Sequence, residues 1–193
     1  MPSTGYRIAR TEDAPAIADI YAPYVRDTII SFETDAPDAS EMRGRMARIG
    51  AQYPWLVAVS DERVIGYAYA CEHRARLAYR WSVDVAVYLA AAEHGKGIGR
   101  ALYERLFRLL REQGYVNAFA GISLPNQPSV GIHEKMGFAP IGIYRRVGYK
   151  VGAWHDVGWW QLDLGEIGDD PVPPRTPAQV ANDPRWKTLL ASK

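Results

Sequence analysis

The chain has 193 residues, 48% of them hydrophobic and 23% charged, and a formal net charge of +1. This composition is ordinary for a globular protein, and so small a net charge gives no reason to expect a nucleic acid or an acidic membrane surface as a partner. A single cysteine excludes an internal disulfide framework, and no apolar run approaches a signal-peptide core or the roughly 20 residues of a membrane span, so we expect a cytoplasmic protein.

Hydrophobic periodicity predicts alternating strands and helices within one domain, residues 1–167. The first strand is expected at 6–9, followed by a helix capped by Thr11. A second helix is expected to begin near Ser40, and strands at 55–59 and 64–70 form a hairpin. The apolar face of the first helix consists of Ile17, Ile20, Tyr21 and Tyr24.

The second half of the domain begins with a strand at 83–89 that leads through a glycine loop into a helix at 100–113. This helix is expected to end at Gly114 and to pair Glu104 with Arg108 on its outer face. The elements that follow are a strand at 115–121, a helix at 128–136 and strands at 138–149 and 154–164. This order predicts an α/β fold with a mixed, largely antiparallel sheet flanked by helices. A proline-rich linker and C-terminal tail occupy 168–193, and the tail is either a short docked helix or frayed.

Three glycines, Gly95, Gly97 and Gly99, stand immediately ahead of the helix at 100–113. The first backbone N–H groups of a helix have no partner within it, and the helix dipole adds partial positive charge, so such a loop is suited to hold a diphosphate. The Walker pattern GxxxxGK[ST] does not occur, and a dinucleotide fingerprint fails because Arg100 or Leu102 stands where a small residue is required. The alternative is a strand-to-helix turn that binds nothing.

This loop resembles the signature of the GCN5-related N-acetyltransferase (GNAT) family, which is Arg or Gln, two residues, Gly, one residue, then Gly or Ala. Residues 94–99 read His-Gly-Lys-Gly-Ile-Gly, with His94 in place of the usual Arg or Gln. The family's second mark is an Asn followed by a helix that ends in Glu-Lys-x-Gly-Phe, and it appears as Asn126 and residues 134–138. Over residues 6–165 the chain is similar to one branch, the phosphinothricin and methionine sulfone or sulfoximine acetyltransferases. The segments that carry this similarity are 53–58, 124–130 and 152–158.

The resemblance implies a GNAT fold in which the fourth and fifth strands splay apart, and acetyl-CoA as co-substrate. The main chain of the fourth strand would hold the pantetheine arm, the glycine loop the pyrophosphate, and Asn126 the pantetheine amide, with a simple helix N-cap as the alternative for Asn126. The implied cofactor-binding residues are Val87, Tyr88, Leu89, Gly95, Lys96, Gly97, Ile98, Gly99, Arg100 and Asn126.

Asp84 stands in an otherwise apolar strand, where a carboxylate needs a compensating interaction. The resemblance implies a general base that takes the proton of the amine directly or through one water. Relatives of this branch usually carry Glu there, and the shorter Asp favours the water relay. The alternative is an ion pair with Arg80 or another basic side chain. His133 stands where many relatives carry a tyrosine that protonates the departing thiolate, with a packing or capping histidine as the alternative.

An arginine just ahead of Asp84 would form a bidentate pair with the α-carboxylate of an amino-acid acceptor. Arg76 is our first choice and Arg74 the second, and a solvated basic loop is the alternative. The implied substrate-binding residues are Arg74, Ala75, Arg76, Asp84, Val85 and Ala86. Cys71 is not expected to carry the acetyl group, and the four histidines lack metal-ligand spacing, so no metal is expected.

The sequence therefore predicts an acetyl-CoA-dependent N-acetyltransferase that acts by direct transfer in a ternary complex. The acceptor implied by the branch is the α-amine of a small amino acid or analogue, such as phosphinothricin, methionine sulfone or methionine sulfoximine. The branch also implies a homodimer and a role in antibiotic or herbicide resistance. Two alternatives stay open. An acetyltransferase of polyamines or peptide N-termini is one, although a polyamine site favours acidic side chains. A non-catalytic acyl-CoA-binding module is the other, and it would dispense with Asp84.

Overall fold

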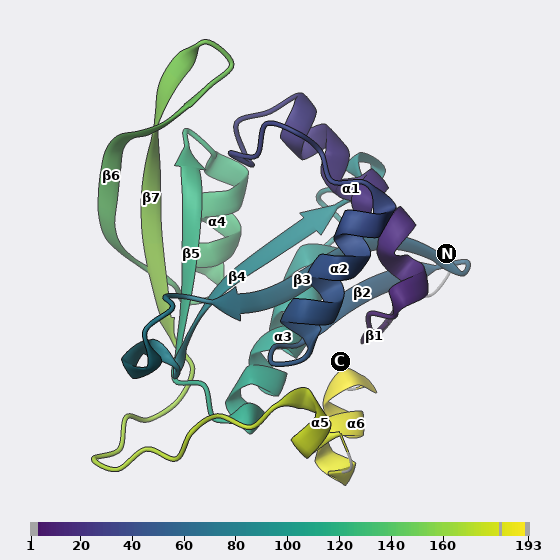
Figure 1. Cartoon of the computed structure of the whole chain (residues 1–193), viewed down its shortest axis with the longest axis vertical. Helices are drawn as coiled ribbons and strands as arrows, with labels where there is room; N and C mark the ends of the chain where they lie inside the picture. Colours follow the sequence, from purple (N-terminus) through teal and green to yellow (C-terminus); the bar gives the residue numbers. More distant parts are fainter. Residues whose placement is uncertain (1–3, 182, 192–193) are drawn as a thin grey trace.

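A computed structural model of the protein describes residues 4–181 and 183–191. Its centre is a seven-stranded sheet in the order β1-β2-β3-β4-β5-β7-β6 (Figure 1). The strands are β1 (Gly5–Ile8), β2 (Trp55–Ser60), β3 (Arg63–Glu72), β4 (Ser82–Leu89), β5 (Asn117–Leu124), β6 (Ala139–Lys150) and β7 (Ala153–Asp163). The helices are α1 (Ala14–Arg26), α2 (Ala39–Gly50), α3 (Ile98–Gln113), α4 (Gln127–Lys135), α5 (Pro177–Val180) and α6 (Pro184–Ala191). Short 3₁₀ turns are η1 (Thr11–Asp13), η2 (Leu77–Tyr79) and η3 (Ala91–Glu93).

Neighbouring strands run antiparallel except β4 and β5, which run parallel. The predicted fold, a largely antiparallel sheet flanked by helices, is confirmed. β4 and β5 pair only over three positions, from Ser82 with Asn117 to Asp84 with Phe119. Beyond that point both strands continue without pairing to each other. We call the unpaired edges, residues 85–89 of β4 and 120–124 of β5, the β4–β5 fork.

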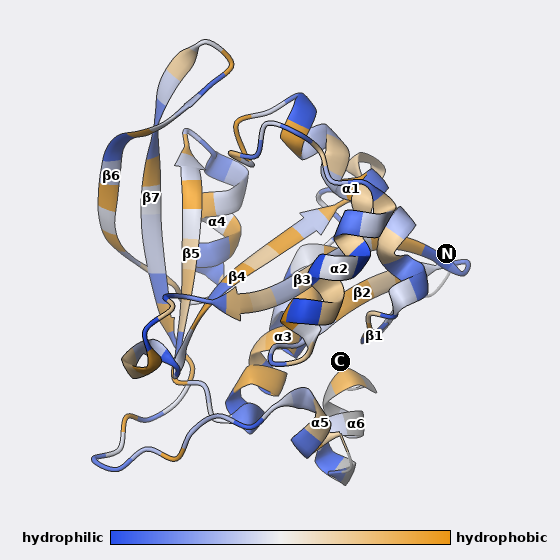
Figure 2. Cartoon of the chain, in the orientation of Figure 1, coloured by the Kyte–Doolittle hydropathy of each residue, from blue (hydrophilic) through white to orange (hydrophobic). Residues whose placement is uncertain are grey.

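The helices form a layer on each face of the sheet because strand side chains alternate between the two faces. On one face, Val83 and Val85 of β4 pack in a core with the apolar side of α3. On the opposite face, Trp55 and Tyr67 pack in a second core with α1 and α2. The apolar stripes of the helices and the apolar strands between them can be followed in Figure 2. Alternation along β4 therefore directs Asp84 and Tyr88 toward the α1–α2 face.

The N-terminal side of α1 differs from the prediction. Thr11 does not cap the helix, because the 3₁₀ turn η1 precedes α1 and the Thr11 hydroxyl contacts the neighbouring Glu12. The buried Asp13 side chain instead accepts hydrogen bonds from the Arg10 amide (2.7 Å) and from both terminal nitrogens of Arg7 (2.6 and 2.7 Å). A carboxylate that forms a buried ion pair with Arg7 thus fixes the turn between β1 and α1.

The end of α3 and the C-terminal tail pack together. Gly114 ends α3 with a left-handed φ of 98°, as the sequence predicted. On the outer face of α3, Glu104 accepts a hydrogen bond from Arg100 (2.8 Å), and its predicted pair with Arg108 stays a prediction. Val180 and Trp186 of the tail are buried in the same core as α3, so the tail docks as short helices over its described residues. No helix in the described ranges is long and apolar enough to cross a membrane.

Candidate active site

The glycine loop has the backbone conformation that a phosphate-binding turn requires. Gly95 and Gly97 have left-handed φ angles of 75° and 80°, and Gly97 is the N-cap of α3. The first intrahelical bond runs from the Ala101 amide to the Gly97 carbonyl (3.0 Å), which leaves the amides of residues 98–100 bare at the positive end of the helix dipole. These amides are hydrogen-bond donors at the start of α3, and their predicted binding of a phosphate stays a prediction.

The two basic side chains of this loop are solvent-exposed and paired locally. Lys96 forms an ion pair with Glu93 (3.1 Å), and Arg100 forms one with Glu104 (2.8 Å). Because each cation is paired with a carboxylate, the two pairs add no net charge to the rim of the loop. Their predicted contact with coenzyme A phosphates stays a prediction.

The main-chain N–H and C=O groups of the three predicted pantetheine-binding residues of β4 do not all point the same way. The Ala90 amide donates to the Ile65 carbonyl of the β3 edge (3.0 Å). Because main-chain groups alternate in direction along an antiparallel strand, those of Tyr88 also face β3, whereas those of Val87 and Leu89 face the β4–β5 fork. Val87 and Leu89 thus have the direction that the prediction requires, and the Tyr88 main chain does not.

The far end of β4 is held by α1. The Tyr24 hydroxyl donates to the Leu89 carbonyl (2.6 Å) and lies 2.9 Å from Nε2 of His94. The Tyr88 ring packs edge-on against the rings of Tyr21 and Tyr24, with centroids 4.9 and 5.1 Å away. The side chain of Tyr88 is therefore part of the α1 packing, and His94 links the glycine loop to the same helix.

The residues of α4 have well-defined structural contacts. The Asn126 side chain caps the helix by accepting from the Ser129 amide (3.2 Å), which confirms its predicted N-cap role. His133 is buried, its Nδ1 donates to the Ser129 carbonyl (2.7 Å), and its Nε2 lies 3.0 Å from the Tyr103 hydroxyl. Burial lowers the pKa of His133, so the ring is neutral near pH 7. Both ring nitrogens are engaged, which is the pattern of the packing alternative, and the acid role of His133 stays a prediction.

Asp84 lies at the closed end of the fork, in the last β4–β5 pair. It is opposite Phe119 on one side and Cys71 on the other. Its carboxylate Oδ1 is 2.6 Å from Nδ1 of His73. Burial raises the pKa of Asp84 above its ordinary value, and the hydrogen bond from His73 offsets part of that effect. The basic partner of Asp84 is therefore His73. Arg80, the partner considered from the sequence, instead donates to the Leu77 carbonyl (3.0 Å).

A cavity of about 220 Å³ lies beside this pair, and we call it the His73 cavity. It is lined by His73, Arg74, Phe119, Ile141, Gly142, Tyr144 and Trp159. The His73 ring stacks on Phe119 with centroids 4.2 Å apart, and the Arg74 guanidinium lies 5.6 Å from the centre of the Trp159 ring. Arg76 and Ala75 line a separate cavity of about 290 Å³, which Arg74 also borders. The structure thus places Arg74, and not Arg76, in the cavity beside Asp84 and His73.

The connection between α1 and α2, residues 27–38, crosses the same face of the sheet. The Lys150 amine donates to the Val25 and Ser31 carbonyls (2.6 Å each), and the Ser123 hydroxyl donates to the Ile30 carbonyl (3.2 Å). These bonds hold the connection against β5 and β6.

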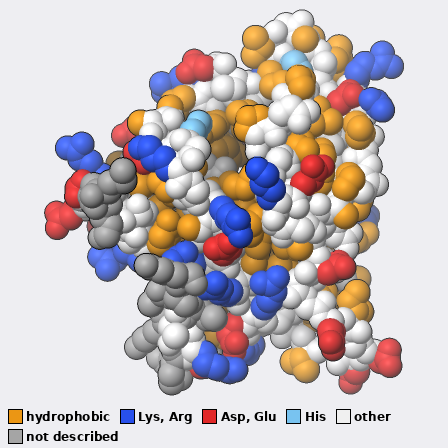
Figure 3. All heavy atoms as spheres, turned by 180° about the vertical axis from the view of Figure 1, so that it is seen from behind, with side chains coloured by type: hydrophobic (Ala, Val, Ile, Leu, Met, Phe, Trp, Pro, Cys, Tyr) orange, Lys and Arg blue, Asp and Glu red, His pale blue; other side chains and the backbone are white. Residues whose placement is uncertain are grey.

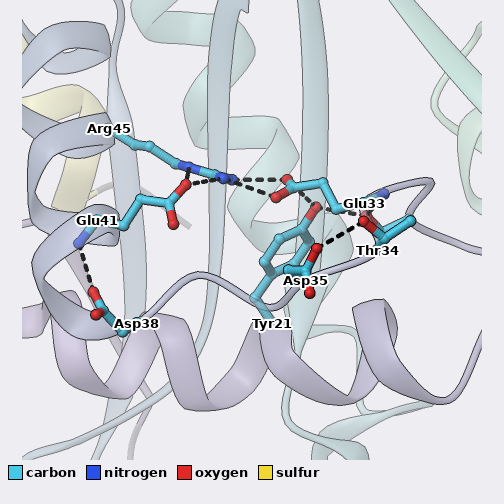
Figure 4. Close-up of polar contacts among 8 residues, drawn as sticks. Tyr21, Glu33, Thr34, Asp35, Asp38, Glu41 and Arg45 are labelled. Atoms are coloured by element: carbon cyan, nitrogen blue, oxygen red, sulfur yellow. Dashed lines mark hydrogen bonds and ion pairs between the residues drawn. The ribbon is translucent and has the colours of Figure 1, made fainter.

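The centre of this connection is fixed by Glu33 (Figure 4). Its carboxylate accepts from the Tyr21 hydroxyl (2.8 Å) and from two nitrogens of Arg45 (2.7 and 2.8 Å). The bidentate bond from Arg45 lowers the pKa of Glu33, so the carboxylate is ionised at neutral pH. The α1–α2 connection is therefore tied to both helices and gives the site a defined wall.

Sequence reasoning missed His73 as the partner of Asp84, and it also missed Phe119 and Tyr144, whereas for Trp159 it left a role in the acceptor pocket open. A partial signal exists for His73. It follows Cys71 by two residues, so if β3 continues past Glu72 both side chains lie on one face. The register that places Cys71 opposite Asp84 was not available from the sequence. The other three residues come from β5, β6 and β7 and meet only in the folded sheet.

Cys71 is unsuited to carry an acetyl group. Burial raises the pKa of its thiol to about 12, and the neighbouring Asp84 charge acts in the same direction. A thiol with such a pKa holds very little thiolate at neutral pH. Within the described part of the chain, no three His, Cys, Asp or Glu side chains converge as a metal site.

Comparison with known proteins agrees with this geometry. Residues 6–159 match the model of an acetyltransferase (GNAT) domain. A phosphinothricin N-acetyltransferase from Streptomyces viridochromogenes is 39% identical over 174 residues, which cover 90% of this chain and 94% of that protein. An L-methionine sulfoximine/L-methionine sulfone acetyltransferase from Salmonella typhimurium is 34% identical over 161 residues, covering 83% of this chain and 94% of that protein.

Among solved structures, a GNAT superfamily phosphinothricin acetyltransferase from Sinorhizobium meliloti in complex with AcCoA superposes with a TM-score of 0.84. It is 34% identical in sequence, and the match covers 88% of this chain and 93% of that one. The chain belongs to the GNAT family of acetyltransferases.

Proposed function

We propose that this protein transfers the acetyl group of acetyl-CoA to the α-amine of a small amino acid or amino-acid analogue of the phosphinothricin, methionine sulfone or methionine sulfoximine type. The observation that carries the proposal is the β4–β5 fork. It has bare helix amides at one end and a partly buried carboxylate, Asp84, at the other. The relatives named above support the choice of acceptor.

The residues of the fork fit acetyl-CoA. Its pyrophosphate needs hydrogen-bond donors and positive potential, which the amides of residues 98–100 supply. Its pantetheine amides need main-chain partners, and the main-chain groups of Val87 face the fork, whereas those of Leu89 are engaged by the Tyr24 hydroxyl. Asn126 caps α4 with its side-chain oxygen, so its side-chain nitrogen is the group we assign to a pantetheine carbonyl. When bound, acetyl-CoA supplies the activated acyl group.

The acceptor site lies on the α1–α2 face, in the His73 cavity. An α-carboxylate there would meet Arg74, whose guanidinium has the planar geometry for a bidentate pair. We therefore assign the acceptor carboxylate to Arg74 in preference to Arg76. Arg74→Ala is expected to raise the KM for the acceptor more than Arg76→Ala does.

The chemistry requires few groups. An amino-acid amine is protonated at neutral pH and must lose a proton before it attacks the thioester. We assign this deprotonation to the site at Asp84, and we assign transfer to a single ternary complex because the Cys71 thiol is protonated at neutral pH. His133 supports the α3–α4 wall through Tyr103 and Ser129.

We propose that the protein is a homodimer that works in the cytoplasm. The β6–β7 hairpin projects from the body of the fold, and hydrophobic side chains gather on that side of the molecule (Figures 1 and 3). The exposed large hydrophobic residues of this hairpin are Ile141, Ile143, Tyr144, Val147, Tyr149, Val151 and Trp154. A patch of this kind is typical of a subunit interface. Val147→Glu combined with Trp154→Glu is expected to give a monomer in light scattering. Acetylation of a toxic analogue in the cytoplasm would confer resistance to it.

The test is a thiol-release assay with acetyl-CoA and five acceptors: phosphinothricin, methionine sulfone, methionine sulfoximine, spermidine and a short peptide. Turnover confined to the three amino-acid analogues is the expected result. Turnover with spermidine or the peptide alone would refute the acceptor assignment while leaving the enzyme class intact. Tight acetyl-CoA binding with no turnover of any acceptor would refute the proposed function.

A further inference from the structure

The His73 cavity is lined by His73 but not by the carboxylate that sequence reasoning made the base. Asp84 is absent from its lining, and the Asp84 side chain is bonded to the imidazole. His73 itself is mostly enclosed, with 12% of its side chain exposed, and the flat face of its ring rests on Phe119. Of the two members of the Asp84–His73 pair, the imidazole is therefore the one that an acceptor in this cavity meets.

Hydrogen bonding fixes which nitrogen of His73 is available. An ionised carboxylate only accepts, so the proton in the 2.6 Å contact belongs to Nδ1. In the neutral ring the other nitrogen, Nε2, then carries a free lone pair. Nε2 has no hydrogen-bond partner among the described residues. The arrangement leaves one unprotonated nitrogen able to take a proton.

We propose that His73 is the general base of the reaction and that Asp84 is the positioning residue that holds its tautomer. The inference rests on the proposed function and deepens it, because it replaces a carboxylate acting on the amine with a His–Asp dyad. Asp84 contacts Nδ1 of the His73 ring and the ring lines the cavity, so the carboxylate can orient the imidazole and stabilise the imidazolium that forms.

The proton and electron balance of the step is complete without another reactant. Nε2 of His73 takes one proton from the acceptor ammonium, and Asp84 stabilises the resulting imidazolium. The free amine attacks the acetyl carbon, a C–N bond forms and the C–S bond breaks. The nitrogen loses a second proton, and the departing thiolate of coenzyme A gains one. The proton on His73 then passes to solvent, so each turnover releases one proton overall.

Several other titratable or charged groups face the dyad. They are Cys71 of β3, Arg74 in the following loop, Tyr79 of η2 and Tyr144 of β6, while Glu72 of β3 acts on Cys71. Burial raises the pKa of the Cys71 thiol to about 12, so this thiol stays protonated across the pH range of the assay. A change in the pH profile that appears in a His73 variant, and not in a control variant of another histidine, therefore identifies the His73 imidazole as the group involved.

The experiment compares wild type, His73→Asn, Asp84→Asn and the double variant. It measures kcat/KM for methionine sulfone from pH 5 to 9.5, the Kd for acetyl-CoA and the melting temperature. Each single variant is expected to lose about 10²–10⁴-fold in kcat/KM with unchanged acetyl-CoA affinity. The double variant is expected to lose no more than the worse single one, because the two residues act as a unit. His73→Asn is also expected to give a rate that rises with pH up to the titration of the acceptor amine, without the break of the wild type.

His155→Asn is the matched control, because His155 lies on β7 with its Nε2 near the Lys150 carbonyl (2.9 Å), outside the cavity. It is expected to keep the wild-type profile. If His73→Asn fails to fold, His73→Gln takes its place. A His73 variant with kcat/KM within threefold of wild type and an unchanged pH profile would overturn the proposal and return the base to Asp84. An inactive wild type would instead refute the proposed function itself, so the two failures are distinguishable.

Discussion

Gly97→Ala tests whether the glycine loop is built by backbone conformation for anion binding. Gly97 has a left-handed φ of 80°, and a Cβ there would meet no atom within 4 Å, so strain and not a steric clash determines the effect. An L-residue pays about 1–2 kcal/mol for this conformation. If the loop keeps its shape, the whole cost appears as lower stability. If the free loop relaxes, part of it appears instead as weaker acetyl-CoA binding, up to roughly 30-fold in Kd.

The two losses together are therefore expected to sum to about 1–2 kcal/mol. Urea unfolding gives the first and isothermal titration with acetyl-CoA gives the second. Gly44→Ala is the control, since Gly44 lies within α2, is exposed and also has open space around its Cβ position. It is expected to stabilise the protein by about 0.5–1 kcal/mol and to leave Kd unchanged. If Gly97→Ala behaves like Gly44→Ala in both assays, our reasoning about the loop is refuted.

Four further variants test the Arg7–Asp13 ion pair, direct transfer and the docking of the C-terminal tail. Arg7→Ala leaves the buried Asp13 carboxylate without its guanidinium and is expected to cost about 3 kcal/mol in urea unfolding. Burial raises the pKa of Asp13, but the hydrogen bonds from Arg7 and from the backbone lower this pKa by more. The ionised Asp13 carboxylate therefore stabilises the fold above the ordinary carboxyl range, and this stabilisation is lost as pH falls through the pKa of the folded state. Asp13→Asn should abolish this acid-dependent loss. Cys71→Ala is expected to keep kcat within threefold, and mass spectrometry of wild type mixed with acetyl-CoA should find no acetylated protein; a stable acetyl-Cys71 would contradict direct transfer. Trp186→Ala is expected to release the C-terminal tail, seen as faster tryptic cleavage after Arg175, because it removes a buried anchor whose loss in a core costs about 3–5 kcal/mol.

The elements that were predicted well are those with a local signal. The 3.6-residue period of Leu102, Leu106 and Leu109 and the left-handed position of Gly114 define α3 without reference to the rest of the chain. The predicted cap of α1 at Thr11 was wrong because a tertiary contact outweighed the local preference for a cap. Arg7 comes from β1, and its bonds to Asp13 favour a 3₁₀ turn over a cap at Thr11.

The residues of the candidate site also differ in whether a local sequence signal predicts them. The glycine loop and the N-cap at Asn126 are local motifs, and the structure places both where the sequence indicated. The partner of Asp84 depends on the register between β3 and β4, because a slip of one residue would turn the side chains of a strand to the other face of the sheet. Arg74 and Arg76 are two residues apart in an irregular loop, where no periodicity indicates which one reaches a cavity. The walls supplied by β6 and β7 come from a non-local hairpin.

The most direct test of the account compares methionine sulfone with 3-(methylsulfonyl)propylamine, the same molecule without its α-carboxylate. The central claim is that this enzyme acetylates the α-amine of an amino acid held by its carboxylate. A charged hydrogen-bonded pair contributes about 1.5–3 kcal/mol, so we expect kcat/KM for methionine sulfone to exceed that for the amine by roughly 10- to 150-fold. We expect this ratio to collapse in Arg74→Ala. Equal values for the two acceptors in the wild-type enzyme, or a preference for the simple amine, would contradict the account.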